Sequence, residues 1–325
     1  MSLKVDLVDG TSFVAEASTI LEQAWTVPSI CYTPAYLRWQ LSFPSAQRLP
    51  SVAAFDGDEP VGFAGVSGRR MRHGASQRDY GVVSFVAVRP QWRKRGIARE
   101  LYRKLVAALR DVNIRVLTFG VPDSIGDLTL LNAYSEAKYS VRPIGVYRNY
   151  GFLARRDPLA SAWDAEEATT AGLLPGIISA CARNIGLIWS DPDGAQVEHY
   201  RADPRPRKLV ILRRHSTGSI GAAWIVQGEY RGPLGAGPVT TVDSIWMPEP
   251  DVAALPALFH FAARAWPEQG GMPVVISAPN LAGFDATAFR GIGLRETGGR
   301  FQGYLCTPNA GDALPACNAT NMEIV

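Results

Sequence analysis

The stretch VAVRPQWRKRGIAREL, residues 86–101, joins an apolar segment to a helical one through a basic loop. The segment Ser84–Val88 is mostly apolar and β-branched, which favours a buried strand. Pro90 ends that strand, because proline has no N–H to donate to a neighbouring strand. After the loop, apolar residues recur at helical spacing, at Ile97, Leu101, Leu105, Ala108 and Leu109. This stretch therefore predicts a strand, a glycine-containing loop and an amphipathic helix, in that order.

The loop before the helix favours binding of an anion. The first N–H groups of a helix have no partner within it, and the helix dipole is positive there. Gly96 lets the backbone approach a phosphate closely, and the small Ala98 does so less completely. Arg93, Lys94 and Arg95 add positive charge. The spacing is neither that of the GxxxxGK[ST] phosphate loop nor that of the dinucleotide-binding GxGxxG loop.

Residues 86–101 resemble motif A of the GNAT acyltransferase superfamily, whose pattern is V-x-P-x-[WYF]-[QR]-x-x-G-[IVL]-[GA]. One departure is Ala98, where glycine is commoner. The resemblance implies that the pantetheine arm of CoA lies against the strand and that N–H groups from Lys94 to Arg99 hold the pyrophosphate. The CoA-binding residues that it implies are Val86, Ala87, Val88, Arg93, Lys94, Arg95, Gly96, Ile97, Ala98 and Arg99.

Two tyrosines compete for the role of general acid, the group that protonates the departing CoA thiolate. The family has a further helix that ends in a tyrosine and is followed by Gly-Phe and a strand. Residues 130–139 (LLNAYSEAKY) resemble that ending and make Tyr134 the acid. Residues 147–152 (YRNYGF) match Gly-Phe more literally and make Tyr147 the acid. We favour Tyr134, because it follows Val121 by 13 residues, close to the family's interval, whereas Tyr147 requires a long insertion.

The acceptor side of the site is less well defined by the sequence. An amine must be neutral to attack a thioester, so a carboxylate or a water chain takes up its proton. Asp79, at the start of the third expected strand, is a candidate base, although such a residue is more often a turn or a cap. The aromatic side chains that either line an acceptor pocket or pack in the core are Trp25, Tyr32, Tyr36 and Trp39.

The chain repeats one order of elements. In the first half we expect two strands, a third strand, a helix and a fourth strand at 51–55, 61–65, 81–88, 97–110 and 116–121. In the second half the same elements fall at 209–212, 220–224, 239–247, 252–266 and 273–277. This order indicates an α+β fold with a mixed α/β sheet. We therefore expect two GNAT-like acyl-CoA N-acyltransferase domains in tandem, at 1–153 and 171–325, joined by a linker at 154–170.

The second half keeps this layout but loses the motif. At the corresponding place residues 246–255 read WMPEPDVAAL, without arginine or glycine. Glu249 and Asp251 there would repel a pyrophosphate. Residues 289–294 (FRGIGL) resemble the Gly-Phe ending but have no tyrosine. The resemblance is specific over roughly residues 52–147, and we expect the second half to complete the acceptor pocket or to mediate assembly.

The charge and composition of the chain favour some classes of protein over others. The formal charge of +3 over 325 residues does not argue for nucleic acid, and the basic cluster from Arg89 to Lys104 is better explained by the phosphates of CoA. No apolar run reaches the roughly 20 residues that span a bilayer, and the N-terminus lacks an apolar signal segment. The four cysteines lack CxxC spacing and the four histidines are scattered, so we expect reduced cysteines, no metal site and a cytoplasmic location.

The residues and the resemblance together predict that the chain is an acetyl-CoA-dependent N-acetyltransferase that acts on the amine of an unidentified acceptor. Acetyl-CoA is its co-substrate, no metal or membrane is expected, nucleic acid is disfavoured and a homodimer is left open. The alternative is a non-catalytic acyl-CoA-binding or sensor protein. A third reading is an aminoacyl transferase that uses charged tRNA, which the CoA motif disfavours.

Overall fold

The computed structural model describes most of the chain. The described ranges are 3–25, 29–44, 48–73, 76–152, 161–181, 187–232, 235–248, 251–269, 273–279, 291–308 and 319–321. Glu249, Phe289, Arg290 and Cys317, which entered the sequence analysis, lie outside them.

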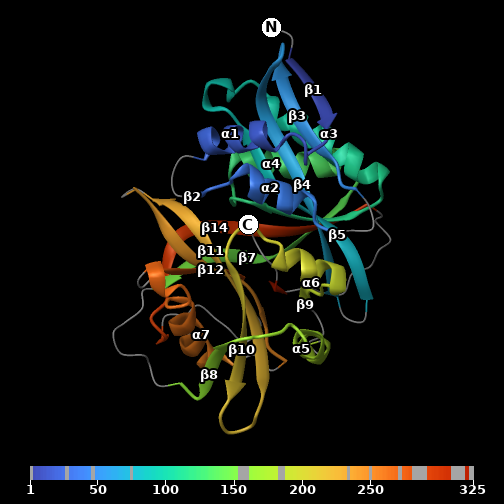
Figure 1. Cartoon of the computed structure of the whole chain (residues 1–325). Helices are drawn as coiled ribbons and strands as arrows, with labels where there is room; N and C mark the ends of the chain where they lie inside the picture. Colours follow the sequence, from blue (N-terminus) through green and yellow to red (C-terminus); the bar gives the residue numbers. More distant parts are fainter. Residues whose placement is uncertain are drawn as a thin grey trace.

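One sheet runs through the molecule from the first half of the chain into the second (Figure 1). Its strands lie in the order β1 (Leu3–Val8), β3 (Ser51–Asp56), β4 (Glu59–His73), β5 (Ser76–Val88), β6 (Arg115–Gly120), β14 (Arg295–Thr307), β7 (Ser140–Phe152), β13 (Val274–Pro279), β12 (Gly235–Trp246), β11 (Ile220–Gly232), β10 (Arg207–Arg214) and β8 (Trp163–Glu167). Three short strands lie off this path: β2 (Ser29–Ile30), β9 (Leu187–Ser190) and β15 (Ala319–Asn321).

The repeated layout is present in the sheet, which confirms the expected mixed α/β fold. Strands β3, β4 and β5 are antiparallel, and β5 then pairs in parallel with β6. Strands β10, β11 and β12 are likewise antiparallel, and β12 pairs in parallel with β13. The edge strands correspond as well, because β1 pairs with β3 as β8 pairs with β10. Each half of the chain thus builds the same unit.

The two halves exchange a strand where they meet. Strand β14, from the second half, pairs antiparallel with β6 of the first half. Strand β7, from the first half, pairs antiparallel with β13 of the second half, and β7 and β14 pair with each other. Each half therefore completes its sheet with a strand from the other. The domain boundaries along the sequence stay a prediction.

Residues 163–167, which we assigned to the linker, form the edge strand β8. The segment looked like a linker because it is rich in charged residues. On an edge strand such charges are common, since they keep other strands from pairing. Here they pair with the neighbouring strand: Glu166 contacts Arg213 and Glu167 contacts Lys208, each at 2.8 Å.

Helices cover both faces of the sheet (Figure 1). In the first half, α3 (Ile97–Asp111) and α4 (Ile125–Glu136) pack on one face, and α1 (Val14–Ala24) and α2 (Pro34–Leu41) pack on the other. The helices of the second half are α5 (Leu174–Cys181), α6 (Gly194–Arg201) and α7 (Leu255–Ala262), with short 3-10 turns at Pro90–Trp92, Val252–Ala254 and Pro267–Gln269. The helix expected at 97–110 is confirmed. The one expected at 252–266 is shorter, a 3-10 turn followed by α7.

An aromatic cluster joins the two halves on the α2 side of the sheet. Tyr36 and Trp39 of α2 pack with Tyr200 and Trp224 of the second half. The Trp39 indole N–H donates to the carbonyl oxygen of His199 at 2.7 Å, and the two rings stack with centroids 5.2 Å apart. Of the four aromatic residues considered for an acceptor pocket, Tyr36 and Trp39 are therefore core residues.

A buried ion network lies beside this cluster. The Asp203 carboxylate contacts Arg205 at 2.9 Å and Arg207 at 2.7 Å, and Arg207 also contacts Asp243 at 2.8 Å. The Arg205 guanidinium lies 3.8 Å from the centre of the Tyr36 ring. Burial alone would raise the pKa of Asp203, but the two arginines outweigh it and hold that pKa below its usual value.

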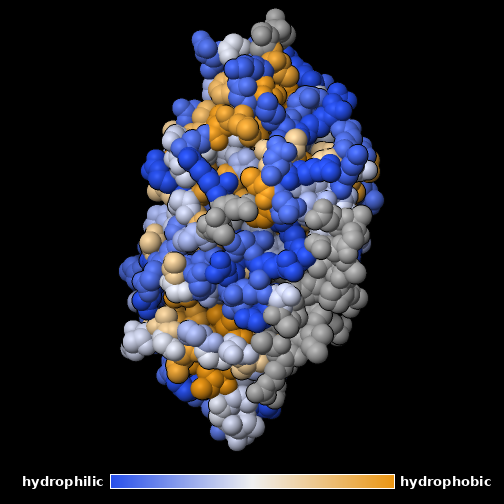
Figure 2. Space-filling model, turned by 90° about the vertical axis from the view of Figure 1, so that its right-hand side faces the viewer, coloured by the Kyte–Doolittle hydropathy of each residue, from blue (hydrophilic) through white to orange (hydrophobic). Residues whose placement is uncertain are grey.

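The surface on one side of the molecule is largely hydrophilic. Figure 2 shows the visible hydrophobic residues in separate groups, divided by a hydrophilic band. Among the described residues, no helix is both long and apolar enough to cross a bilayer. Within the same ranges Cys31, Cys181 and Cys306 are free thiols.

We predict that Asp203→Asn lowers the free energy of unfolding by about 3 kcal/mol, because it removes the carboxylate that the buried Arg205 contacts and one of the two that the buried Arg207 contacts. Urea denaturation measures this loss. Because the pKa of Asp203 is lowered in the folded state, its contribution is present above about pH 4 and is lost as pH falls further. As a control, Glu136→Gln breaks the exposed pair with Arg103 and should cost less than about 1 kcal/mol. Equal losses would contradict the prediction.

Candidate active site

Strands β5 and β6 separate near the middle of the first half. Their parallel pairs run from Tyr80↔Arg115 to Val83↔Thr118, and the described residues show none beyond. At this point β5 also has a bulge, since its register with β4 shifts between Val83 and Phe85 and leaves Ser84 as the extra residue. Among the described residues, β5 beyond the bulge is paired with β4 alone, so its other edge is open.

The open edge presents backbone groups at two of the predicted CoA-binding residues. The Arg89 N–H donates to the carbonyl oxygen of Val61 in β4 at 2.9 Å. Because antiparallel pairs alternate, Val88 and Val86 point their N–H and C=O groups away from β4, toward the open edge. The backbone of Ala87 points toward β4 instead. A ligand with its own amide groups can thus pair with β5 at Val86 and Val88 as a further strand would.

The loop after β5 leads directly into the start of α3. Lys94 and Gly96 have φ angles of 64° and 78°, in the left-handed region. Gly96 is the N-cap residue and supplies no side-chain acceptor, and the first intrahelical bond runs from the Glu100 N–H to the Gly96 carbonyl oxygen at 3.2 Å. The N–H groups of residues 97–99 therefore have no acceptor within the helix, which suits an anion.

The basic side chains of the loop have different surroundings. The Arg93 guanidinium donates to the carbonyl oxygen of Ala24 at 2.5 Å and to that of Val88 at 3.4 Å, so it ties the loop to the end of α1. Arg95 lies over the Trp92 ring, 4.6 Å from its centre. Lys94 is exposed at the tip. Arg93 thus positions the loop, while Lys94 and Arg95 supply charge at the surface.

The remaining predicted CoA-binding residues lie in the first turn of α3. Ile97 is buried in the core beneath the helix, so its N–H rather than its side chain faces the loop. Ala98 is partly buried. Arg99 is exposed and lies 3.4 Å from the carboxylate of Glu100.

Tyr134 is placed beside the point where the strands separate. It lies on α4, fully buried, with its ring edge-on to Tyr139 at 5.3 Å. Burial raises the pKa of Tyr134 well above 10, with Cys306 and Tyr139 adding to the shift and the nearby Thr118 hydroxyl opposing it. Because Thr118 is the last residue of β6 paired with β5, the Tyr134 hydroxyl lies next to the separation. It keeps its proton at neutral pH and can donate it.

Tyr147 is placed elsewhere. It lies on β7, two strands away from β6, and pairs with Phe301 of β14 and Pro279 of β13. Its ring is buried edge-on to Phe119 at 5.0 Å, and a Cβ on Gly303 would lie 2.6 Å from it. The structure thus places Tyr134 near Thr118, where the pairing of β5 and β6 ends, and places Tyr147 against Phe119, the next residue of β6.

The residues considered for the acceptor side are not all in one place. Tyr32 packs edge-on to Phe85, just after the bulge, at 5.8 Å and contacts Trp25 at 5.2 Å. Asp79 forms an ion pair with Arg70 at 3.0 Å. It lies five residues before Ser84 along β5, roughly 17 Å away, so it is not at the bulge.

A buried carboxylate near the separation escaped the sequence analysis. Asp127, on α4, is 4% exposed, and its Oδ2 accepts a hydrogen bond from the Tyr304 hydroxyl at 2.8 Å. One sequence signal could have pointed to it, because an acidic residue seven positions before Tyr134 lies on the same helix face. Nothing local to Tyr304 pointed there, since it is 177 residues away in the chain.

The second half repeats the bulge without the loop. The parallel pairs of β12 and β13 end at Val242↔Ile276, and the register of β12 shifts at Asp243, which corresponds to Ser84. Asp243 is buried against Arg207. Helix α7 then begins at Leu255, with Pro256 in its first turn and no glycine cap. The described part of this region has neither the basic loop nor the positive φ angles found before α3.

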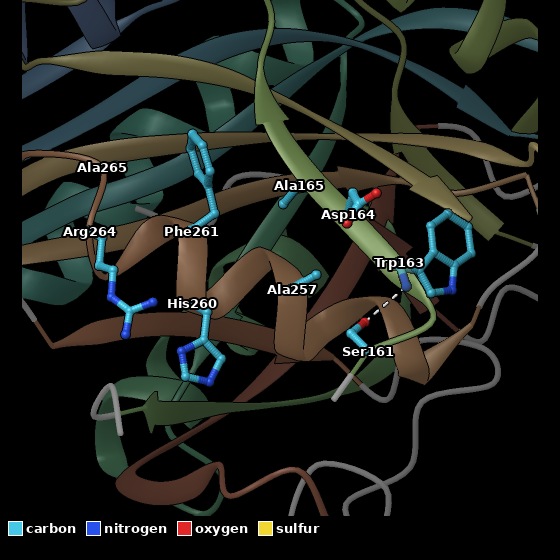
Figure 3. Close-up of a pocket in the computed structure, with 9 residues that line it drawn as sticks. All are labelled: Ser161, Trp163, Asp164, Ala165, Ala257, His260, Phe261, Arg264 and Ala265. Atoms are coloured by element: carbon cyan, nitrogen blue, oxygen red, sulfur yellow. Dashed lines mark hydrogen bonds between the residues drawn. The ribbon is translucent and has the colours of Figure 1, made fainter. Parts of the chain in front are cut away.

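A separate hollow lies in the second half between β8 and α7 (Figure 3). Its volume is about 510 Å³, and its lining residues are Ser161, Trp163, Asp164, Ala165, Ala257, His260, Phe261, Arg264 and Ala265. Ser161 bonds to the backbone of Trp163 and Ala253, and the Trp163 indole N–H bonds to Asp251. These polar groups serve the fold, and the hollow lies far from the separation of β5 and β6. Within the described ranges, no group of His, Cys, Asp and Glu is placed to hold a metal.

Comparison with known proteins finds a family model for part of the chain and several solved structures of similar fold. Residues 15–125 match the acetyltransferase (GNAT) family model. No curated protein matches the sequence.

Solved structures resemble the chain over nearly its whole length. N-myristoyltransferase from Saccharomyces cerevisiae with bound myristoyl-CoA has a TM-score of 0.66 at 10% identity, covering 100% of this chain and 89% of that one. GCN5-related N-acetyltransferases from Sphaerobacter thermophilus and Anabaena variabilis ATCC 29413 have TM-scores of 0.59 and 0.56 at 15% and 12% identity. The first match covers 95% of this chain and 96% of that one, and the second covers 97% and 75%. At these identities the likeness shows the fold.

We predict that Gly96→Ala raises the Kd for CoA about tenfold, because a Cβ at φ 78° costs about 1–2 kcal/mol and shifts the N–H groups at the start of α3. Titration calorimetry measures the Kd. Gly57→Ala is the matched control: Gly57 also has a positive φ, 58°, and neither glycine has an atom closer than 4.0 Å to an added Cβ. Both variants should lose similar stability, and the prediction fails if both bind CoA equally well.

Proposed function

We propose that the chain is an acetyl-CoA-dependent N-acetyltransferase, which moves an acetyl group from CoA to an amine by direct attack. One observation carries this proposal: the open backbone edge of β5 at Val86 and Val88 leads directly to the uncapped helix start at Gly96. A strand edge suits the amide-containing pantetheine arm, and a helix start suits the pyrophosphate. CoA carries both groups at the two ends of one chain.

In this proposal each part of the site has one role in binding. The N–H groups from Lys94 to Arg99 hold the pyrophosphate, with Lys94 and Arg95 adding charge. The amides of the pantetheine arm pair with Val86 and Val88. The arm then leads the thioester to the bulge at Ser84, beside the Tyr134 hydroxyl.

The chemistry is an acyl transfer in two steps. The neutral amine attacks the thioester carbon and forms a C–N bond, and the C–S bond then breaks. Tyr134 gives its proton to the departing thiolate, and the proton lost by the amine passes to water. Burial of Tyr134 supports this role, because it keeps the hydroxyl protonated until the thiolate forms.

The acceptor would reach the thioester from the α1 side of β5. Trp25 and Tyr32 are partly buried there, and Tyr32 packs on Phe85 next to the bulge. The guanidinium of Arg93 holds the end of α1 against the loop, so the acceptor wall and the CoA loop move together. We propose the cytoplasm as the location, which the free thiols of Cys31, Cys181 and Cys306 support.

The part of the sheet where β5 and β6 are paired favours a short acyl group. Ahead of the bulge, β5 and β6 are paired from Tyr80 to Val83, and the side chains of β5 there are at most 4% exposed. The strands therefore leave no gap for a long chain between them. Longer acyl groups are the second candidate, because the similar N-myristoyltransferase was solved with myristoyl-CoA.

We predict that Tyr134→Phe lowers kcat by about a hundredfold or more while leaving the Kd for CoA unchanged, because it removes only the proton donor. Thiol release with a panel of amines measures the rate, and calorimetry measures the Kd. Tyr147→Phe serves as the matched comparison and should keep full activity. The opposite result would make Tyr147 the acid. CoA binding by a wild-type chain that releases no thiol with any amine would favour the non-catalytic sensor.

We predict that kcat rises with pH as the acceptor amine loses its proton and does not fall again below about pH 10. The acid form of Tyr134 is the active one, and its raised pKa keeps it protonated over this range. A pH profile measured with saturating acetyl-CoA tests this. An alkaline fall centred near pH 8 that Tyr134→Phe abolishes would contradict it.

A further inference from the structure

The strand exchange brings a tyrosine of the second half into the first half. Tyr304 of β14 is paired with Thr118 of β6, and Thr118 is in turn the last residue of β6 paired with Val83 of β5. These three residues form a row across the sheet. Val83 and Tyr304 belong to the core cluster under α3 and α4 that also holds Tyr134. Tyr304 therefore reaches the same region as the proposed acid.

The Tyr304 hydroxyl holds a buried carboxylate in place. It donates to Oδ2 of Asp127 at 2.8 Å, and the Asp127 residue is 4% exposed. The other oxygen, Oδ1, has no hydrogen-bond donor among the described residues. It lies against the backbone of Gly120, where an added Cβ would be 2.0 Å away. A buried carboxylate oxygen without a donor is costly, which points to a donor that arrives with a ligand.

The register places Gly120, which this oxygen contacts, across the gap from the open edge of β5. Gly120 lies two residues beyond Thr118 on β6, and Val86 lies three residues beyond Val83 on β5, with the bulge between. The two positions are therefore nearly level on either side of the separation. A ligand bound along Val86 would lie between β5 and the part of β6 that Asp127 contacts at Gly120.

We propose that Asp127, oriented by Tyr304 of the second half, accepts a hydrogen bond from an amide N–H of the pantetheine arm. This inference rests on the proposed function of the site. Val86 and Val88 then bind one side of the arm and Asp127 binds the other. Tyr304 is a positioning residue, because it acts through the carboxylate. The second half would thus complete the CoA site of the first half through β14.

The test compares two ligands in the full chain. Tyr304→Phe keeps the ring in the core and removes the hydroxyl alone. It should raise the Kd for CoA about tenfold, because a bond to a charged group is lost. The Kd for 3′-phospho-ADP, the nucleotide half of CoA, should not change, because that fragment has no pantetheine arm. The KM for acetyl-CoA should rise while kcat stays the same.

A second variant separates orientation from packing. Asp127→Asn should also weaken CoA binding. The Tyr304 hydroxyl would donate to the side-chain amide oxygen, so the NH₂ group would face the N–H of the arm, and two donors form no hydrogen bond. In the double variant with Tyr304→Phe the amide is free to turn its oxygen to the arm. Asp127→Asn with Tyr304→Phe should therefore bind CoA more tightly than Asp127→Asn alone, a recovery that lost packing would not produce.

Tyr139→Phe is the matched control, because Tyr139 is buried in the same cluster and its hydroxyl donates to the carbonyl oxygen of Ile114 at 3.3 Å. It should leave the Kd for CoA unchanged. Equal binding of CoA by Tyr304→Phe and the wild type would overturn the inference, as would equal weakening of CoA and 3′-phospho-ADP. A wild-type chain that binds no CoA would instead overturn the proposed function itself.

Discussion

The ladder between β6 and β14 is the interaction on which the rest of the structure depends. Its pairs run from Val116↔Cys306 to Gly120↔Gln302 and join segments almost two hundred residues apart. Without β14, the edge of β6 away from β5 would have no partner, and unpaired backbone inside a protein is costly. Strand β7 does the same for β13 in return. The exchange joins the two halves of the chain in one continuous sheet. The candidate site in the first half therefore depends on a strand of the second half.

This continuity explains how the first half can leave a gap in its own sheet. β5 and β6 part after Val83↔Thr118, and the bulge at Ser84 turns β5 away. On the far side, β6 stays fixed because β14 pairs along it as far as Gly120. A strand that is held on one edge can leave its other edge open without loss of order. The proposed CoA site therefore depends on backbone pairing supplied by the second half.

The second half has the same strand layout, but its described residues lack the basic loop that precedes α3 in the first half. It keeps a bulge, at Asp243, and a parallel ladder that stops at Val242↔Ile276. At the bulge it has an acidic residue paired with the buried Arg207, where the first half has Ser84. That ion pair joins β12 to β10 within the second half. The duplicated fold thus has one candidate site among the described residues, and the copy without it supports the other.

The sequence by itself determined the local part of this protein. The strand, loop and helix of residues 84–111 are contiguous, so β-branched residues, Pro90, Gly96 and the helical spacing together define them and the candidate anion site between them. The repeated order of elements was readable for the same reason. Only the tertiary structure decided which strands pair across the halves, that Trp163–Glu167 is an edge strand, and that Asp127 meets Tyr304. Strand partners far apart in the chain share no local pattern, because an apolar strand fits many neighbours and only the complete sheet selects one.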